Sequence, residues 1–263
     1  MIIVKIGGGK TINLESIIAD LAQIQEPFLI VHGANALRDE IAEALGKPKK
    51  VLTSISGYSS TYSDKDSIDI LIMAYAGLRN KRIVELCHQY RINAVGLSGL
   101  DGKLIQGRRN RGIRIRENNK TKIIRDFSGK PDKVNLSFLN LLLENCFVPV
   151  LSVPIIDENN NAINSENDDI VTLLQHSLQA ETIIQLIEAR GFLDNKNDPL
   201  SLVSRISVSE LIEREEQVEG RMKRKILALR KLLDNGSTKV IISDGRVEHP
   251  IQDALAGKGT IIN

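Results

Sequence analysis

Short apolar runs rich in β-branched residues alternate with longer stretches in which apolar positions recur every three to four residues. Strands are predicted at Ile2–Ile6, Phe28–Val31, Asn93–Leu97, Val148–Val153, Thr182–Ile187, Lys239–Ser243 and Thr260–Ile262. Helices are predicted at Leu14–Gln23, Ala36–Leu45, Ser67–Tyr90, Asn135–Asn145, Asp168–Leu178, Val208–Arg214 and Arg221–Asn235. This alternation is typical of parallel βαβ units with helices on both faces of the sheet. The predicted fold class is α/β, a three-layer αβα sandwich around a mainly parallel sheet.

The segment 102–133 breaks this rhythm. Short alternating strands are predicted at Gly102–Ile105, Ile113–Arg116 and Thr121–Ile124, with residues 117–120 as a hairpin turn. Eleven basic and three acidic residues lie between Lys103 and Lys133, so this segment carries about +8, although the whole chain carries only +2. We expect this segment, here called the basic arm, to project beside the main sheet.

The predicted domain organisation has two lobes that share one continuous sheet. The N-terminal lobe covers residues 1–160 and includes the basic arm, and the C-terminal lobe covers 161–263. The best candidate for the crossing is Ile155–Asn164, because it contains a polar Asp-Glu-Asn-Asn-Asn run.

Composition excludes several classes of protein. With 42% hydrophobic and 26% charged residues, the 263-residue chain is ordinary for a globular protein. No segment approaches the roughly 20 apolar residues of a membrane-spanning helix, and the chain opens with a strand, so a cytoplasmic protein is expected. Cys87 and Cys146 lie in apolar stretches and are predicted to be reduced core thiols. No protein ligands for a metal are predicted.

Two glycine loops are candidate anion-binding sites. Val4-Lys5-Ile6-Gly7-Gly8-Gly9 and Leu29-Ile30-Val31-His32-Gly33-Ala34-Asn35 each run from a strand into a loop whose N–H groups an anion can approach closely. Two such loops indicate two anions brought face to face. Lys5 could meet one of them, although a lysine near the end of a terminal strand can also extend along apolar surface to water.

Lys225 and Asp168 are the other candidates. In the helix that follows Gly220, Met222, Ile226, Leu229 and Leu233 form the apolar face, and Lys225 lies at its edge. Asp168 precedes an apolar helix, where an ordinary N-cap is the default interpretation. The functional interpretation is that Asp168 orients two ammonium groups.

The order of these motifs resembles the amino acid kinase family, and within it the acetylglutamate kinase branch. The similarity spans the chain and is carried by Val4–Gly8, Val31–Gly33, Gly96–Gly102, Asn164–Asp168 and Gly220–Lys225. Further motifs resemble the kinases that phosphorylate 2-aminoadipate or glutamate on an acidic amino-group carrier protein, in lysine and arginine biosynthesis. These motifs are Ala76–Arg82, Gly107–Arg109 and Asp244–Glu248.

The resemblance implies an amino acid kinase fold and direct transfer of the γ-phosphoryl group of ATP to a side-chain carboxylate, with Mg²⁺ on the phosphates. It implies that Lys5 and Lys225 stabilise the transition state and that Asp168 orients both lysines. The implied ATP contacts are Gly7, Gly8, Gly191 and Met222, and the implied substrate contacts are Gly33, Ala34, Asn35, Thr61 and Asn164. Three places depart from the family. Ala34 follows Gly33 where the family has a further glycine, Thr61 replaces an arginine that holds the substrate's α-carboxylate, and Ile187-Glu188 replaces a Ser-Asp or Ser-Asn pair.

The basic arm suits an acidic partner, because its charge would steer a carrier protein toward the site. Arg108, Arg109 and Arg111 are the predicted docking residues. Acetylglutamate kinase, which needs no carrier, is the close alternative, and a catalytically weak ligand sensor is another. A nucleic-acid module ranks last, since the arm has one aromatic residue, Phe127. The apolar Ser67–Tyr90 helix is expected either to pair in a homodimer or to be buried within one subunit.

Overall fold

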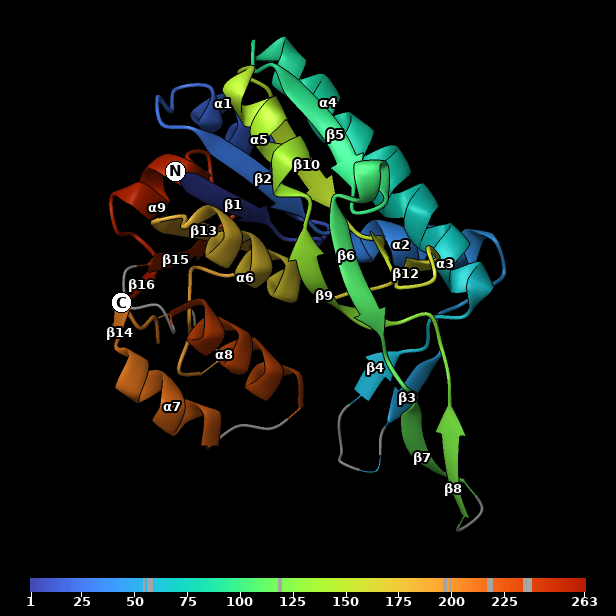
Figure 1. Ribbon diagram of the computed structural model, residues 1–263. Helices are drawn as coiled ribbons and strands as arrows, with labels where there is room; N and C mark the ends of the chain where they lie inside the picture. The colour runs from blue at the N-terminus through green and yellow to red at the C-terminus, as the bar shows by residue number, and fades with distance from the viewer. Residues whose placement is uncertain are drawn as a thin grey trace.

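The computed structural model describes residues 1–53, 55, 59–117, 120–195, 198, 200–216, 220–233 and 238–263, with backbone alone at 53, 59, 60, 117 and 220–225. Its centre is an eight-stranded sheet (Figure 1). The strand order is β14 (Arg205–Ile206), β16 (Thr260–Ile262), β15 (Lys239–Asp244), β13 (Thr182–Ile187), β1 (Ile2–Ile6), β2 (Phe28–His32), β10 (Val148–Ser152) and β5 (Ala94–Ser98). Neighbouring strands are parallel except β15 and β16. The predicted α/β class with a mainly parallel sheet is confirmed.

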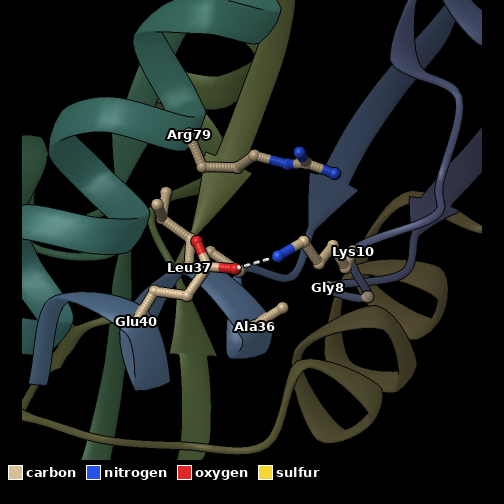
Figure 2. A pocket seen from close by; sticks show the side chains of 8 residues that line it. Gly8, Lys10, Ala36, Leu37, Glu40 and Arg79 are labelled. Carbon is tan, nitrogen blue, oxygen red and sulfur yellow. Dashed lines mark ion pairs between the residues drawn. The ribbon is translucent and has the colours of Figure 1, made fainter. Parts of the chain in front are cut away.

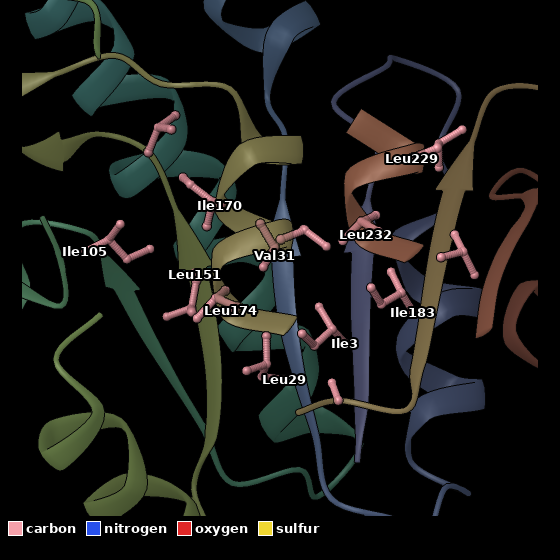
Figure 3. Close-up of a cluster of buried hydrophobic side chains, with 14 of the residues drawn as sticks. Ile3, Leu29, Val31, Ile105, Leu151, Ile170, Leu174, Ile183, Leu229 and Leu232 are labelled. Carbon is pink, nitrogen blue, oxygen red and sulfur yellow. The ribbon is translucent and has the colours of Figure 1, made fainter. Parts of the chain in front are cut away.

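Helices cover both faces because both faces of the strands are apolar. Ile3 and Val31 point toward one face, which packs against α5 (Leu136–Glu144), α6 (Asn167–Leu178) and α8 (Gly220–Leu233). Figure 3 shows this cluster around the central strands. Val4 and Ile30 point toward the other face, which packs against α1 (Leu14–Leu21), α4 (Asn80–Gln89) and α9 (Pro250–Leu255). The three layers follow from this alternation.

The predicted helix at 67–90 is continuous but not uniformly α-helical. It consists of α3 (Lys65–Leu71), a π-helical turn η1 (Ile72–Arg79) and α4. Ile68, Leu71 and Tyr75 are buried within the subunit, whereas Leu78 is exposed. Burial inside the chain therefore accounts for most of the apolar face, and pairing in a homodimer stays a prediction.

A second, four-stranded sheet lies at the carboxyl end of the main one, in the order β12 (Ala162–Ile163), β11 (Ile155–Ile156), β6 (Ile105–Arg109) and β9 (Gly129–Val134). The hairpin β7 (Ile113–Glu117) and β8 (Lys120–Ile124) projects from it beside β3 (Val51–Thr53) and β4 (Ser59–Thr61) (Figure 1). The projecting hairpin is as predicted, although positions 118 and 119 of its turn lie outside the described residues.

Several expectations need correction. The predicted strand at Gly102–Ile105 is wrong, because Asp101–Lys103 forms a 3₁₀ turn and β6 begins at Ile105. The segment 155–164 forms the antiparallel pair β11 and β12 rather than a plain connection, and the two-lobe division stays a prediction. Cys87 is buried as expected, but Cys146 is exposed and is not a core thiol. Within the described ranges, no helix has both the length and the apolar character needed to cross a membrane.

Candidate active site

The two glycine loops pack directly on each other at the carboxyl ends of β1 and β2. The carbonyl of Gly8 accepts a hydrogen bond from Ala36 N–H at 3.0 Å, at the start of α2 (Asn35–Ala44). A Cβ on Gly8 would lie 2.6 Å from the Ala34 nitrogen, and one on Gly33 would lie 2.8 Å from the Gly8 nitrogen. Only glycine permits this approach, so the sequence of the loops places their backbones in contact.

Lys5 and Asp168 form an ion pair although they are 163 positions apart. Lys5 lies on the same face of β1 as Ile3, the face that packs against α6. Its Nζ donates to Oδ1 of Asp168 in the first turn of α6. The side chains are 15% and 23% exposed, so the pair is largely removed from water. The side-chain amide of Asn167 donates to the His32 carbonyl at 3.1 Å, which fastens α6 to the second loop. The N-cap position of α6 is Glu166, so the default interpretation of Asp168 as an N-cap is wrong.

The third predicted catalytic residue, Lys225, lies on α8, which packs against α6. Ile226, Leu229 and Leu233 are buried, as the helical spacing predicts. The side chains of Lys225 and Met222 lie outside the described residues. The structure therefore brings together Lys5 and Asp168, and the approach of Lys225 stays a prediction.

Two hydrogen bonds hold side chains of the predicted substrate residues. Tyr75 donates its hydroxyl proton to Oδ1 of Asn35, and the side-chain amide of Asn164 donates to Ser63 Oγ at 3.2 Å. Ser63 follows Thr61 by two residues, and Thr61 is half-buried at the end of β4. Ser63 Oγ donates to the Thr61 carbonyl at 3.5 Å, so Asn164 and Thr61 are linked through Ser63, whereas Asn35 is held by Tyr75. The side chain of Thr61 is uncharged.

The residues on the predicted nucleotide side are engaged in packing and hydrogen bonds within the chain. Gly191 is buried with φ near +156°, and a Cβ there would lie 2.6 Å from Thr260 Oγ1, so packing alone requires glycine. Glu188 accepts hydrogen bonds from N and Oγ1 of Thr11 at 2.8 and 2.7 Å. These bonds hold the pKa of its carboxyl below the ordinary value and keep a negative charge beside Gly9. Gly7 donates its N–H to the Leu186 carbonyl at 2.9 Å and joins the loop to β13.

His32 is fully buried below the second loop, and burial lowers its pKa to about 3. Its Nε2 lies 3.1 Å from the side-chain nitrogen of Asn80, which also donates to the Val150 carbonyl at 2.9 Å. A neutral imidazole in this position supports the loop and carries no charge to the site.

The base of the basic arm is hydrogen-bonded to Ser63 and to the predicted substrate residue Asn164. Asp126 is buried, and its Oδ2 accepts from Ser63 N–H at 3.2 Å. The Phe127 carbonyl accepts from Asn164 N–H at 2.7 Å, and the Arg109 guanidinium lies 4.0 Å over the Phe127 ring. Arg109 is therefore half-buried and held against the base of the arm, and its docking role stays a prediction. Of the other predicted docking residues, Arg108 pairs with Asp132 at 2.9 Å on the surface, and Arg111 is exposed.

A cavity of about 170 Å³ opens beside the loops, between Gly8, Gly9 and Lys10 on one side and α2 on the other. Figure 2 shows Arg79 reaching into it from the end of η1, above an ion pair between Lys10 and Glu40. Arg79 is not among the predicted site residues. Arg79 lies within the Ala76–Arg82 motif, but helical spacing does not tell which way the side chain of a residue at the end of a π-helical turn points, so its place in the cavity was not predicted.

The site thus combines two glycine loops that contact each other with a lysine–aspartate pair, one of whose members lies on the strand that leads into the first loop. The chain belongs to the amino acid kinase family, whose model matches residues 1–244. It is 41% identical to the [LysW]-aminoadipate kinase of Thermus thermophilus, and the alignment covers all of both chains.

The [LysW]-aminoadipate/[LysW]-glutamate kinase of Sulfolobus acidocaldarius is 31% identical, again over the full length of both. Among solved structures, N-acetylglutamate synthase from Neisseria gonorrhoeae superimposes with a TM-score of 0.78 at 20% identity. That superposition covers 99% of this chain and 58% of that one. This likeness shows the fold alone.

Proposed function

We propose that the protein is an ATP-dependent kinase that phosphorylates the side-chain carboxylate of 2-aminoadipate, or glutamate, attached to an acidic amino-group carrier protein. The product is an acyl phosphate for lysine or arginine biosynthesis. Full-length similarity to LysW-dependent kinases supports the substrate class. The observation that carries the proposal is the Lys5–Asp168 pair beside two glycine loops in contact, because a phosphoryl transfer between two anions needs a fixed cation there.

The residues of the chain supply position and charge rather than a nucleophile. Gly7 and Gly8 would hold the β- and γ-phosphates, while Gly33, Ala34 and Asn35 would receive the acceptor carboxylate. Lys5, held by Asp168, would neutralise charge on the moving phosphoryl group, and Lys225 would approach from α8. When bound with ATP, Mg²⁺ would neutralise phosphate charge. The negative charge of Glu188 beside Gly9 is consistent with a cation on this side.

The basic arm would dock the carrier. Ten of its eleven basic residues are exposed. Its base is hydrogen-bonded to Ser63 and to the predicted substrate residue Asn164. A carrier bound along this arm would therefore present its attached amino acid to the site. We also propose a cytoplasmic enzyme that forms homodimers, in which exposed Met73 and Leu78 on η1 would meet a second copy.

The test is ADP release with ATP and three acceptors: carrier-bound 2-aminoadipate, carrier-bound glutamate and free acetylglutamate. We expect turnover with at least one carrier-bound acid and little with the free one. Preference for free acetylglutamate would replace this proposal with the acetylglutamate kinase alternative. No turnover with any of the three would support the ligand sensor.

Docking has its own variant. The double reversal Arg108→Glu and Arg111→Glu should raise KM for the carrier-bound acceptor by about 10-fold or more at low salt and leave KM for ATP unchanged. The effect should shrink as salt is added, because the attraction is between exposed charges. Arg91→Glu, an exposed arginine at the end of α4, is the control. An unchanged KM in the double variant would remove the docking role.

A further inference from the structure

Arg79 is half-buried, and its guanidinium has no anion among the described residues. Its Nε and Nη2 atoms are buried and have no hydrogen-bond partner there. Burial lowers the pKa of this guanidinium, and no acid in the described part of the chain opposes the shift. A guanidinium withdrawn from water is costly unless an anion and hydrogen-bond acceptors replace the water.

The acid that lines the same cavity does not fill this need. The Glu40 carboxylate pairs with Lys10 at 3.0 Å, and Figure 2 shows the Arg79 guanidinium apart from that pair. Arg38, on the neighbouring helix, is also neutralised, because its Nη2 lies 2.7 Å from Asp39 Oδ1. Arg79 thus differs from Arg38, because its charge has no partner among the described residues and is available to a ligand.

The cavity indicates what kind of anion this is. Its volume of about 170 Å³ is below the range of about 300–1,000 Å³ typical of sites that enclose a drug-sized ligand, so it suits a small anionic group rather than a nucleoside. Its walls include Gly8 and Ala34, one residue from each loop. A group in the cavity would therefore lie beside the place where the two reacting anions meet.

We propose that Arg79 binds the second carboxylate of the acceptor amino acid, an inference that rests on the proposed function. An acidic amino acid attached through its amino group keeps two carboxylates. One receives the phosphoryl group, and the α-carboxylate stays charged throughout and needs its own cation. Lys5 is engaged by Asp168, and Thr61 is uncharged. The planar guanidinium of Arg79 can make the paired hydrogen bonds that a carboxylate accepts.

The test combines a change in the protein with a matching change in the ligand. The carrier is loaded with 2-aminoadipate or with 5-aminopentanoate, which lacks only the α-carboxylate. Binding of each to wild type, Arg79→Met and Arg79→Lys is measured by calorimetry, and KM for ATP is measured in parallel. The control is Arg82→Met, three residues further along, where the exposed guanidinium pairs with Glu85 at 2.7 Å.

Wild type and the control should bind the 2-aminoadipate form about 10- to 100-fold more tightly than the 5-aminopentanoate form, as expected for a hydrogen-bonded charge pair. Arg79→Met should lose most of this preference with KM for ATP unchanged, and Arg79→Lys should keep part of it. The same preference in Arg79→Met as in wild type would overturn the inference, as would a rise in KM for ATP alone. The binding preference without any turnover would refute the proposed kinase activity and leave the role of Arg79 intact.

Discussion

Replacing Asp168 by Asn tests the most specific arrangement in the site. The substitution keeps the shape of the side chain and one oxygen that can accept a hydrogen bond from Lys5. It removes the negative charge that pairs with the Lys5 ammonium. We therefore expect the fold to survive and the chemical step to slow, because Lys5 would no longer be fixed where charge spreads in the transition state.

The size of the effect follows from the burial of the pair. Two unit charges about 4 Å apart attract by about 4 kcal/mol at an effective dielectric constant of about 20. The side chains are 15% and 23% exposed, so solvent screens this attraction only in part, and the remaining hydrogen bond returns some of it. A loss of about 3 kcal/mol corresponds to a fall in kcat of about 10²-fold.

The assay is ADP release at saturating ATP and carrier-bound acceptor, with circular dichroism to check folding. Asp169→Asn is the matched control, because Asp169 lies in the same first turn of α6 and its loss affects the helix dipole equally. A kcat for Asp168→Asn equal to that of the control would refute the reasoning.

Two other variants extend the account. Lys225→Met should lower kcat by about 10²- to 10³-fold with no change in melting temperature, whereas Lys223→Met in the same helix should be active; equal activities would remove Lys225 from the mechanism. His32→Gln tests the buried imidazole. As the pH falls from about 6 to 4, the free energy of unfolding of wild type should decrease by about 1.4 kcal/mol per pH unit more than that of His32→Gln. The reason is that the unfolded imidazole binds a proton in this range, whereas the buried imidazole, with a pKa of about 3, does not. The same pH dependence of the unfolding free energy in both proteins, measured by urea titration, would contradict this.

Periodicity was sufficient for seven of the eight strands of the main sheet and for the longer helices that cover it, because the central strands are buried on both faces. It failed for the small elements. The two-residue strands β11 and β14 and the six-residue helix α9 are too short to show a period, and their positions depend on tertiary contacts. The 3₁₀ turn at Asp101–Lys103 is also too short to show a period. Asp101 accepts a hydrogen bond from Ser98 N–H at 2.7 Å, a local bond that apolar alternation does not reveal.

The site could be predicted in part. The pairing of Lys5 with Asp168 was expected from the resemblance and is present, although nothing in the spacing of two residues so far apart predicts contact. The structural role of Arg109 was missed, because stacking on Phe127 depends on how β6 and β9 pair. Arg79 was missed for a similar reason: the absence of a partner for a charged group is a property of the folded chain.

The most direct measurement is the fate of the phosphoryl group on the carrier. The enzyme is incubated with ATP and carrier-bound 2-aminoadipate in the presence of hydroxylamine, which converts an acyl phosphate into a stable hydroxamate, and the intact mass of the carrier is measured. A hydroxamate is expected on the side-chain carboxylate, formed in step with ADP and about 10²-fold more slowly with Asp168→Asn. ADP release with an unmodified carrier would contradict this expectation.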